Sequence, residues 1–262
     1  MFRPQITSSN GLRRSLIAVA VTALAGIGTL GSVQAMPVNI GGVVFDPDSP
    51  ATFQMNSGNL RETEVTSIGD TLSGYGLVSA INGTSQATFC PSCELTFEFS
   101  YIVTAIAGST VEFDFGSAQF YVDNTPDFDV LNPATAGDGN LWLGLAGHEI
   151  SAFGTSSELV GMLSIGTFGA LPIAGFGLGA FDVIGGLAGA YLDTDGFSDG
   201  LGGTTDLTFS SSFQTTGNPP ANYPIFGSFD MQGDAMAIPE AGTLGLMGLG
   251  LIALGLARVR KA

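Results

Sequence analysis

The sequence predicts an all-β fold, a sandwich or jelly-roll-like domain of antiparallel strands. Charged residues, among them the helix formers Lys, Arg and Glu, make up only 11% of the 262 residues, while glycine alone contributes 39. Thr, Ser, Val and Phe are abundant, and this balance favours strands joined by glycine turns. Hydrophobic residues reach 45%, which is enough for a sizeable core.

The strand signals are runs in which apolar and polar residues alternate, as they do in a strand with one buried face. The clearest run is residues 94–101, in which every second residue from Leu95 to Tyr101 is apolar and would face the core. Residues 161–191 are apolar and rich in glycine, which indicates buried, closely packed strands. Further strand-like runs cover residues 38–45, 71–81, 111–115, 118–122 and 207–213.

Acidic residues dominate the body of the chain. Between Met36 and Glu240 all 23 acidic residues are opposed by a single basic residue, Arg61, so this stretch carries a charge of 1 − 23 = −22. Such a surface repels nucleic acid, because it cannot neutralise phosphates, and it attracts divalent cations or a cationic partner. A solvated acidic coat that keeps the protein soluble is the alternative explanation.

The N-terminus has the features of a signal peptide. Basic residues, including Arg13 and Arg14, precede an apolar stretch at residues 16–30, and small residues lead up to Ala35. This layout predicts export of the chain, with cleavage between Ala35 and Met36. The adjacent arginines also fit the twin-arginine export route.

The C-terminus has three parts: a polar element at Pro239 and Glu240, an apolar run at residues 242–257, and a basic end. The run contains no charged residue, which predicts a hydrophobic helix that enters the inner membrane transiently. Basic residues hold their end of such a helix in the cytoplasm and leave the body outside. The basic end consists of Arg258, Arg260 and Lys261. The chain is therefore expected to divide into a signal peptide (1–35), a β-rich extracytoplasmic domain (36–235) and a C-terminal tail (236–262).

This tail resembles the PEP-CTERM sorting signal of Gram-negative bacteria. Pro239 and Glu240 match the first two residues of its Pro-Glu-Pro element, and Ala241 stands where the family usually has the second proline. The Leu/Gly-rich run and the basic end match the remainder. The resemblance implies processing by an exosortase and delivery to the cell surface or to an exopolysaccharide-rich biofilm matrix. It covers only the tail and implies nothing about the fold or activity of the body.

Cys90 and Cys93 are the only two cysteines. In an oxidising compartment this close pair predicts a structural disulfide, placed directly before the strand at residues 94–101. A redox site and half of a zinc site are the alternatives. Both are disfavoured, because a redox pair needs a βαβ setting and zinc needs further ligands.

The acidic segment around residues 193–200 is the candidate metal site. Asp193, Asp195 and Asp199 offer hard oxygen ligands, and Gly196 permits a sharp turn, so the segment is a candidate Ca²⁺ site. A plain Asp/Gly turn is the favoured interpretation. The acidic stretches at residues 46–48 and 123–129 are weaker candidates.

No convincing catalytic constellation is present, so the protein is expected not to be an enzyme. His148 is the only histidine, and no Gly-x-Ser-x-Gly motif marks a nucleophile for it to activate. Trp142, the only tryptophan, lies between leucines and is expected in the core. The acidic residues do permit a carboxylate pair of the kind that glycoside hydrolases use.

These observations together predict an exported structural or adhesive protein of the cell surface or matrix. Divalent cations would bridge its acidic surface to acidic exopolysaccharide, and an exosortase would process its tail. A carbohydrate-binding module that uses exposed aromatics such as Tyr121 or Tyr223 is the first alternative, and a polysaccharide hydrolase is the second.

Overall fold

The computed structural model describes most of the body of the chain. The chain divides into two units, Met1–Ala35 and Met36–Ala262, and every described residue belongs to the second. The predicted signal peptide therefore lies outside the described residues. So does the predicted apolar helix, except for Leu251, whose backbone is helical. The described residues are 37–47, 52–217, 219–220, 222–236 and 251.

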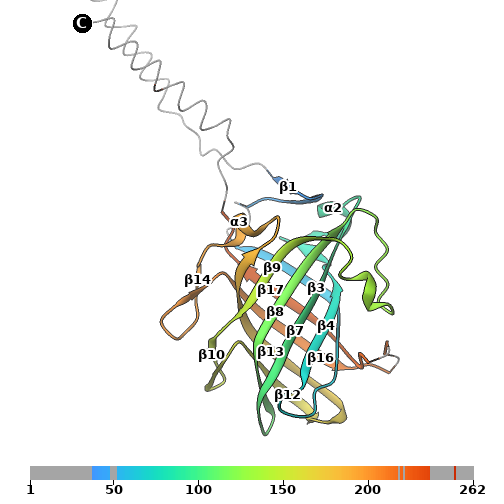
Figure 1. The fold of residues 1–262 in the computed structure, drawn as a ribbon, viewed down its shortest axis with the longest axis vertical. Coiled ribbons are helices and arrows are strands. Elements are labelled where there is room, and N and C mark those ends of the chain that lie inside the picture. Colours follow the sequence, from blue (N-terminus) through green and yellow to red (C-terminus); the bar gives the residue numbers. More distant parts are fainter. Residues whose placement is uncertain (1–36, 48–51, 218, 221, 237–250, 252–262) are drawn as a thin grey trace, which may run out of the picture. The chain divides into compact units, whose positions relative to one another are not determined.

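The described chain consists almost entirely of antiparallel strands (Figure 1). Three small hairpins stand apart from the main sheet: β1 (Val38–Ile40) with β2 (Val43–Phe45), β10 (Ile150–Ala152) with β11 (Thr155–Ser157), and β14 (Phe197–Ser198) with β15 (Thr204–Thr205). The short helices are α2 (Gln86–Phe89), η1 (Pro133–Thr135) and α3 (Gly189–Leu192). The main sheet contains β3 (Phe53–Glu62), β4 (Thr71–Leu77), β5 (Ala80–Ile81), β6 (Thr84–Ser85), β7 (Glu94–Ala107), β8 (Thr110–Asp123), β9 (Asn140–His148), β12 (Leu159–Thr167), β13 (Ala170–Gly185), β16 (Leu207–Thr215) and β17 (Ile225–Gly233).

The main sheet closes on itself, because β17 pairs with β3 as well as with β16. The circuit runs β3, β4, β7, β8, β12, β13, β16, β17 and back to β3. Strand β9 shares the position of β12 between β8 and β13, pairing with the stretch of β8 that β12 leaves open. The predicted all-β antiparallel fold is confirmed, and the layers that pack face to face are opposite walls of one closed sheet.

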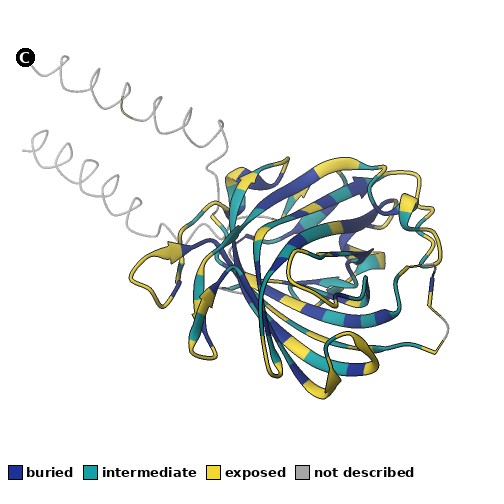
Figure 2. Cartoon of the chain, turned by 60° about the horizontal axis from the view of Figure 1, so that its bottom comes forward, coloured by how far each residue is buried: buried dark blue, intermediate teal, exposed yellow. Residues whose placement is uncertain are grey.

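Aromatic side chains from opposite walls fill the interior. Leu95, Phe97 and Tyr101 on β7 are buried, as the alternation predicts. The ring of Phe97 lies 4.9 Å from that of Phe229 on β17, and the ring of Tyr101 lies 6.2 Å from that of Phe181 on β13. Figure 2 shows buried and exposed stretches alternating along the strands, as expected for walls with one face inside.

Strand β8 joins the two predicted runs 111–115 and 118–122 into one element. Between them the strand bulges: Phe115 has a φ of 58° and is 77% exposed. The ring of Tyr101 lies over the next residue, Gly116, so that a Cβ there would collide with the ring. The glycine in the bulge therefore leaves the space that the buried Tyr101 ring occupies.

Two predicted strands are each divided into two shorter strands. The run 38–45 is the hairpin β1–β2, because Gly41 and Gly42 adopt φ values of 67° and 110° that reverse the chain. The run 71–81 is split into β4 and β5. The indole N–H of Trp142, which is fully buried, donates to the carbonyl of Ile40 at 3.1 Å and thereby attaches the first hairpin to the core.

Candidate functional site

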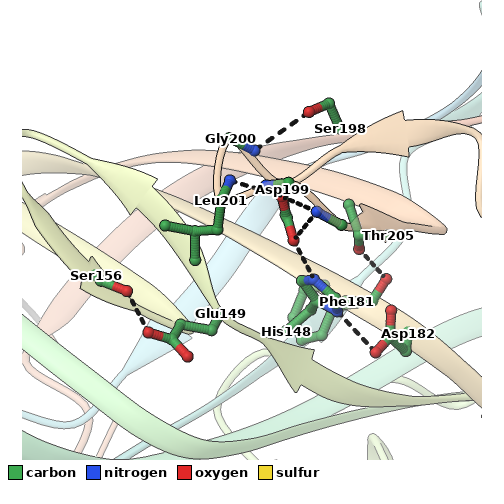
Figure 3. Close-up of polar contacts among 12 residues, drawn as sticks. His148, Glu149, Ser156, Phe181, Asp182, Ser198, Asp199, Gly200, Leu201 and Thr205 are labelled. Carbon is green, nitrogen blue, oxygen red and sulfur yellow. Dashed lines mark hydrogen bonds and ion pairs between the residues drawn. The ribbon is translucent and has the colours of Figure 1, made fainter.

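His148 lies between two carboxylates at one end of strand β9 (Figure 3). Its Nδ1 is 2.8 Å from an oxygen of Asp182 on β13, and its Nε2 is 3.4 Å from an oxygen of Asp199, which follows β14. Strands β9 and β13 are paired here, and the β14–β15 hairpin brings in the third residue. This group connects a surface hairpin to the main sheet.

Only the protonated imidazole satisfies both contacts. A neutral ring has one N–H donor, so one of its nitrogens would face a carboxylate with no proton between them. Burial by itself would lower the pKa of His148, but the hydrogen bonds and negative charges of Asp182 and Asp199 outweigh it and raise the pKa above 6.5. The arrangement suits a structural ion pair rather than a general base. The hydroxyl of Ser156 bonds to Glu149 instead of to the ring.

Asp199 also organises its own loop. Its carboxylate accepts hydrogen bonds from the backbone N–H groups of Leu201 at 2.7 Å, Gly202 at 3.0 Å and Gly203 at 2.9 Å. These bonds, the Leu201 bond first, lower the pKa of Asp199 and keep it ionised. The carboxylate is therefore already engaged by the protein.

Asp206 organises the segment before it in the same way, by accepting hydrogen bonds from backbone N–H groups. Its buried carboxylate accepts from the N–H groups of Val183 at 2.7 Å, Thr194 at 2.6 Å and Asp195 at 2.7 Å. Asp195 adopts a φ of 51°, which a turn of this kind requires. The segment from α3 to β15 is thus held by backbone-to-carboxylate bonds.

The structure does not bring the predicted calcium ligands together. Asp193, Asp195 and Asp199 do not form a group with mutually close ligand atoms, because the turn at Asp195 points the backbone at Asp206 and Asp199 bonds the loop amides. The one group of three acidic side chains found among the described residues whose ligand atoms lie within 4.8 Å of one another is Glu94, Asp123 and Asp127.

The Glu94 group forms where the β7–β8 pairing reaches its end. Glu94 is directly opposite Asp123 in the register, and its carboxylate accepts from the N–H groups of Asp127 at 3.1 Å and Phe128 at 3.0 Å. Burial raises the pKa of Glu94, and the charges of Asp123 and Asp127 add to the effect, against the two backbone bonds. Oxygen ligands of this type suit Ca²⁺. The acidic stretch 123–129 was the sequence signal for two of these residues.

A disulfide joins Cys90 and Cys93 directly before the Glu94 group. Both cysteines are buried, and they lie between α2 and β7. The side-chain amide of Gln86 donates to the carbonyl of Cys93 at 2.9 Å. The bridge therefore belongs to a compact corner that positions the start of β7.

The two tyrosines suggested for sugar stacking are both engaged by the protein. The ring of Tyr223 packs edge-on against Tyr75, with centroids 4.8 Å apart. The hydroxyl of Tyr121 donates to the side chain of Gln119. Both tyrosines are half-buried.

Glu62 is a chemically distinctive residue that the alternation pattern does not reveal. It is only 7% exposed on the inner face of β3, and burial raises its pKa to about 7. Its neighbour Arg61 lies on the other face, with its guanidinium 4.8 Å from the centroid of the Phe226 ring. Glu62 therefore projects a carboxyl group into an apolar interior with no basic side chain beside it on that face.

The C-terminal tail matches a known sorting motif. Residues 237–261 match the model of the PEP-CTERM protein-sorting motif. The tail is a PEP-CTERM sorting signal. A PEP-CTERM signal marks an exported protein that is sorted through its C-terminus, and it is the substrate signal of an exosortase.

The PEP-CTERM match covers the tail alone. No curated protein and no solved structure matches the chain. Within the part of the chain that the structure describes, no helix has both the length and the hydropathy needed to cross a membrane.

Proposed function

We propose that this protein is a structural or adhesive component of the cell surface or extracellular matrix of a Gram-negative bacterium. The observation that carries the proposal is the PEP-CTERM signal at residues 237–261, attached to an acidic all-β body. A closed sheet and a disulfide both suit a protein that works outside the cell.

Divalent cations would link this body to acidic exopolysaccharide. Arg61 is the only basic residue between Met36 and Glu240, and its guanidinium lies against the Phe226 ring. The ion pairs that the described residues form with one another both use His148. Within the part of the chain that the structure describes, basic side chains therefore neutralise few of the carboxylates, and a cation held between protein and polymer carboxylates would bind the two together.

The destination is tested on protein recovered from the matrix fraction of its own host. Mass spectrometry of the C-terminal peptide should show a chain that ends near Pro239 or Glu240. A double variant, Pro239→Ala with Glu240→Ala, should keep the tail and stay with the cells. A wild-type chain that still carries Arg260 and Lys261 in the inner membrane would contradict sorting to the matrix.

The bridging mechanism is tested with alginate as the acidic polymer. The processed protein should co-sediment with alginate in calcium chloride and lose this association in EGTA at the same ionic strength. Association that is equally strong in EGTA would refute cation bridging. The polymer length, measured in the same samples, should stay constant, and shortened chains would instead indicate a hydrolase.

A further inference from the structure

Two adjoining cavities lie inside the closed sheet. One has a volume of about 40 Å³ and the other of about 30 Å³. Both are lined by Glu62 of β3, Leu159 of β12 and Ser211 of β16. The two cavities therefore adjoin at Glu62.

The Glu62 carboxyl has no partner among the described residues. No hydrogen bond or ion pair to it is formed there, although the residue is 93% buried, being 7% exposed. Buried polar groups in folded proteins almost always have a partner, and a buried charge without one is strongly disfavoured. An unpartnered acceptor beside an empty cavity indicates a site that a ligand can occupy.

The remaining walls are almost wholly apolar. Ser211 contributes a hydroxyl to both cavities, while aromatic and aliphatic side chains form nearly all of the rest. Small-molecule sites usually have this composition, an apolar lining with very few polar groups that fix the orientation. The aromatic walls of the second cavity consist of six phenylalanines, among them Phe97 and Phe229, together with Tyr101.

We propose that the interior of the closed sheet binds a small alkylammonium ion, with its ammonium group on Glu62 and its alkyl chain among the phenylalanines. The ammonium supplies the hydrogen bonds and the positive charge that the carboxylate lacks. The site is independent of where the tail directs the protein, so it goes beyond the proposed matrix role.

Cavity size limits the ligand to a few heavy atoms. A water-sized group needs roughly 10–15 Å³ of such space, so the two cavities together hold about five such groups. A butylammonium ion, with about five non-hydrogen atoms, matches this capacity, whereas octylammonium exceeds it. Butanol has the same size but leaves the charge of the carboxylate unpaired, so the amine is the better fit.

The proposal is tested by titrating the processed protein with n-butylammonium chloride at pH 8 in a calorimeter, in about 0.15 M salt to screen the acidic surface. One ion should bind per chain. Glu62→Gln should weaken binding by about tenfold or more. Asp230→Asn removes the same charge from an exposed position on neighbouring β17 and should bind as the wild type does.

Wild-type protein alone provides a second test, which does not depend on the folding of any variant. Octylammonium and n-butanol should each bind about tenfold or more weakly than butylammonium. Three results would each overturn the proposal: no saturable binding of butylammonium, equal binding by Glu62→Gln, or an octyl chain bound as well as a butyl chain. The last two would place the ion on the acidic surface instead.

Discussion

Replacement of Glu62 by glutamine should change how the stability of the protein depends on pH. In the folded protein the pKa of Glu62 is about 7, against 4.5 for an ordinary glutamate. The folded state therefore holds a proton between these values that the unfolded chain releases. It follows that the stability contributed by Glu62 is fully present below pH 4.5 and is lost as the pH rises through 7.

The size of the effect follows from the pKa difference. One pKa unit corresponds to about 1.4 kcal/mol. The shift of Glu62 from 4.5 to about 7 therefore makes the wild type about 3 kcal/mol less stable above pH 7 than below pH 4.5, counting this group alone. Glu62→Gln cannot ionise and avoids this loss. The difference in unfolding free energy between variant and wild type should therefore grow by about 3 kcal/mol between pH 4 and pH 8.

Urea unfolding without reductant, read by tryptophan fluorescence, measures this difference. Trp142 is the only tryptophan and is fully buried, so it reports the loss of the core. Asp230→Asn serves as the control, because it removes a charge at an exposed position of the adjoining strand. A difference that stays constant from pH 4 to pH 8 would show that the Glu62 carboxyl is not held in an apolar interior.

Four further predictions concern single groups. Asp206→Ala leaves three backbone N–H groups without their acceptor and should lower the unfolding free energy by roughly 1–3 kcal/mol in urea, whereas an unchanged midpoint would contradict this anchoring role. The stability that His148 contributes is present below pH 6.5 and is lost as the pH rises through its raised pKa. Hydrogen exchange of the backbone amides in the Asp199 loop should therefore speed up over that range more in the wild type than in His148→Gln. Calcium should raise the melting temperature of the wild type. Asp127→Asn should reduce this rise more than Asp195→Ala does, because of these two only Asp127 lies in a group with converging ligand atoms. The opposite order would favour the 193–199 loop. Gly116→Ala places a methyl group in the ring of Tyr101 and should destabilise the protein by roughly 1–3 kcal/mol, which the same urea titration checks against Gly58→Ala at an open position.

Local patterns were enough to predict the strands with regular alternation. The run 94–101 predicts β7 and the run 207–213 predicts β16, because each keeps one face inward along its whole length. Strand β3 was missed for a physical reason: Gly58 and Asn59 together oppose one residue of β17, so the inward face changes from odd to even positions. An alternation count cannot follow such a bulge.

The candidate sites depend on pairings that are distant in sequence. The Glu94 group exists because the β7–β8 register places Glu94 opposite Asp123, and the interior position of Glu62 depends on the same bulge in β3. The spacing of Asp193, Asp195 and Asp199 suggested a shared ion, but backbone amides are the partners that the structure gives to Asp199. Composition predicted the acidic character of the body and could not indicate which carboxylate lies inside.

The pairing of β17 with β3 has a consequence for the timing of export. The sheet cannot close until its last strand, which ends at Gly233, has joined a strand that begins at Phe53. If the chain crosses the membrane as a thread, nearly the whole body must emerge before the ring of hydrogen bonds is complete. The tail that follows Gly233 is then still in transit, so we expect the protein to finish folding while it is held at the membrane, and an early cut to release a chain that has not yet closed.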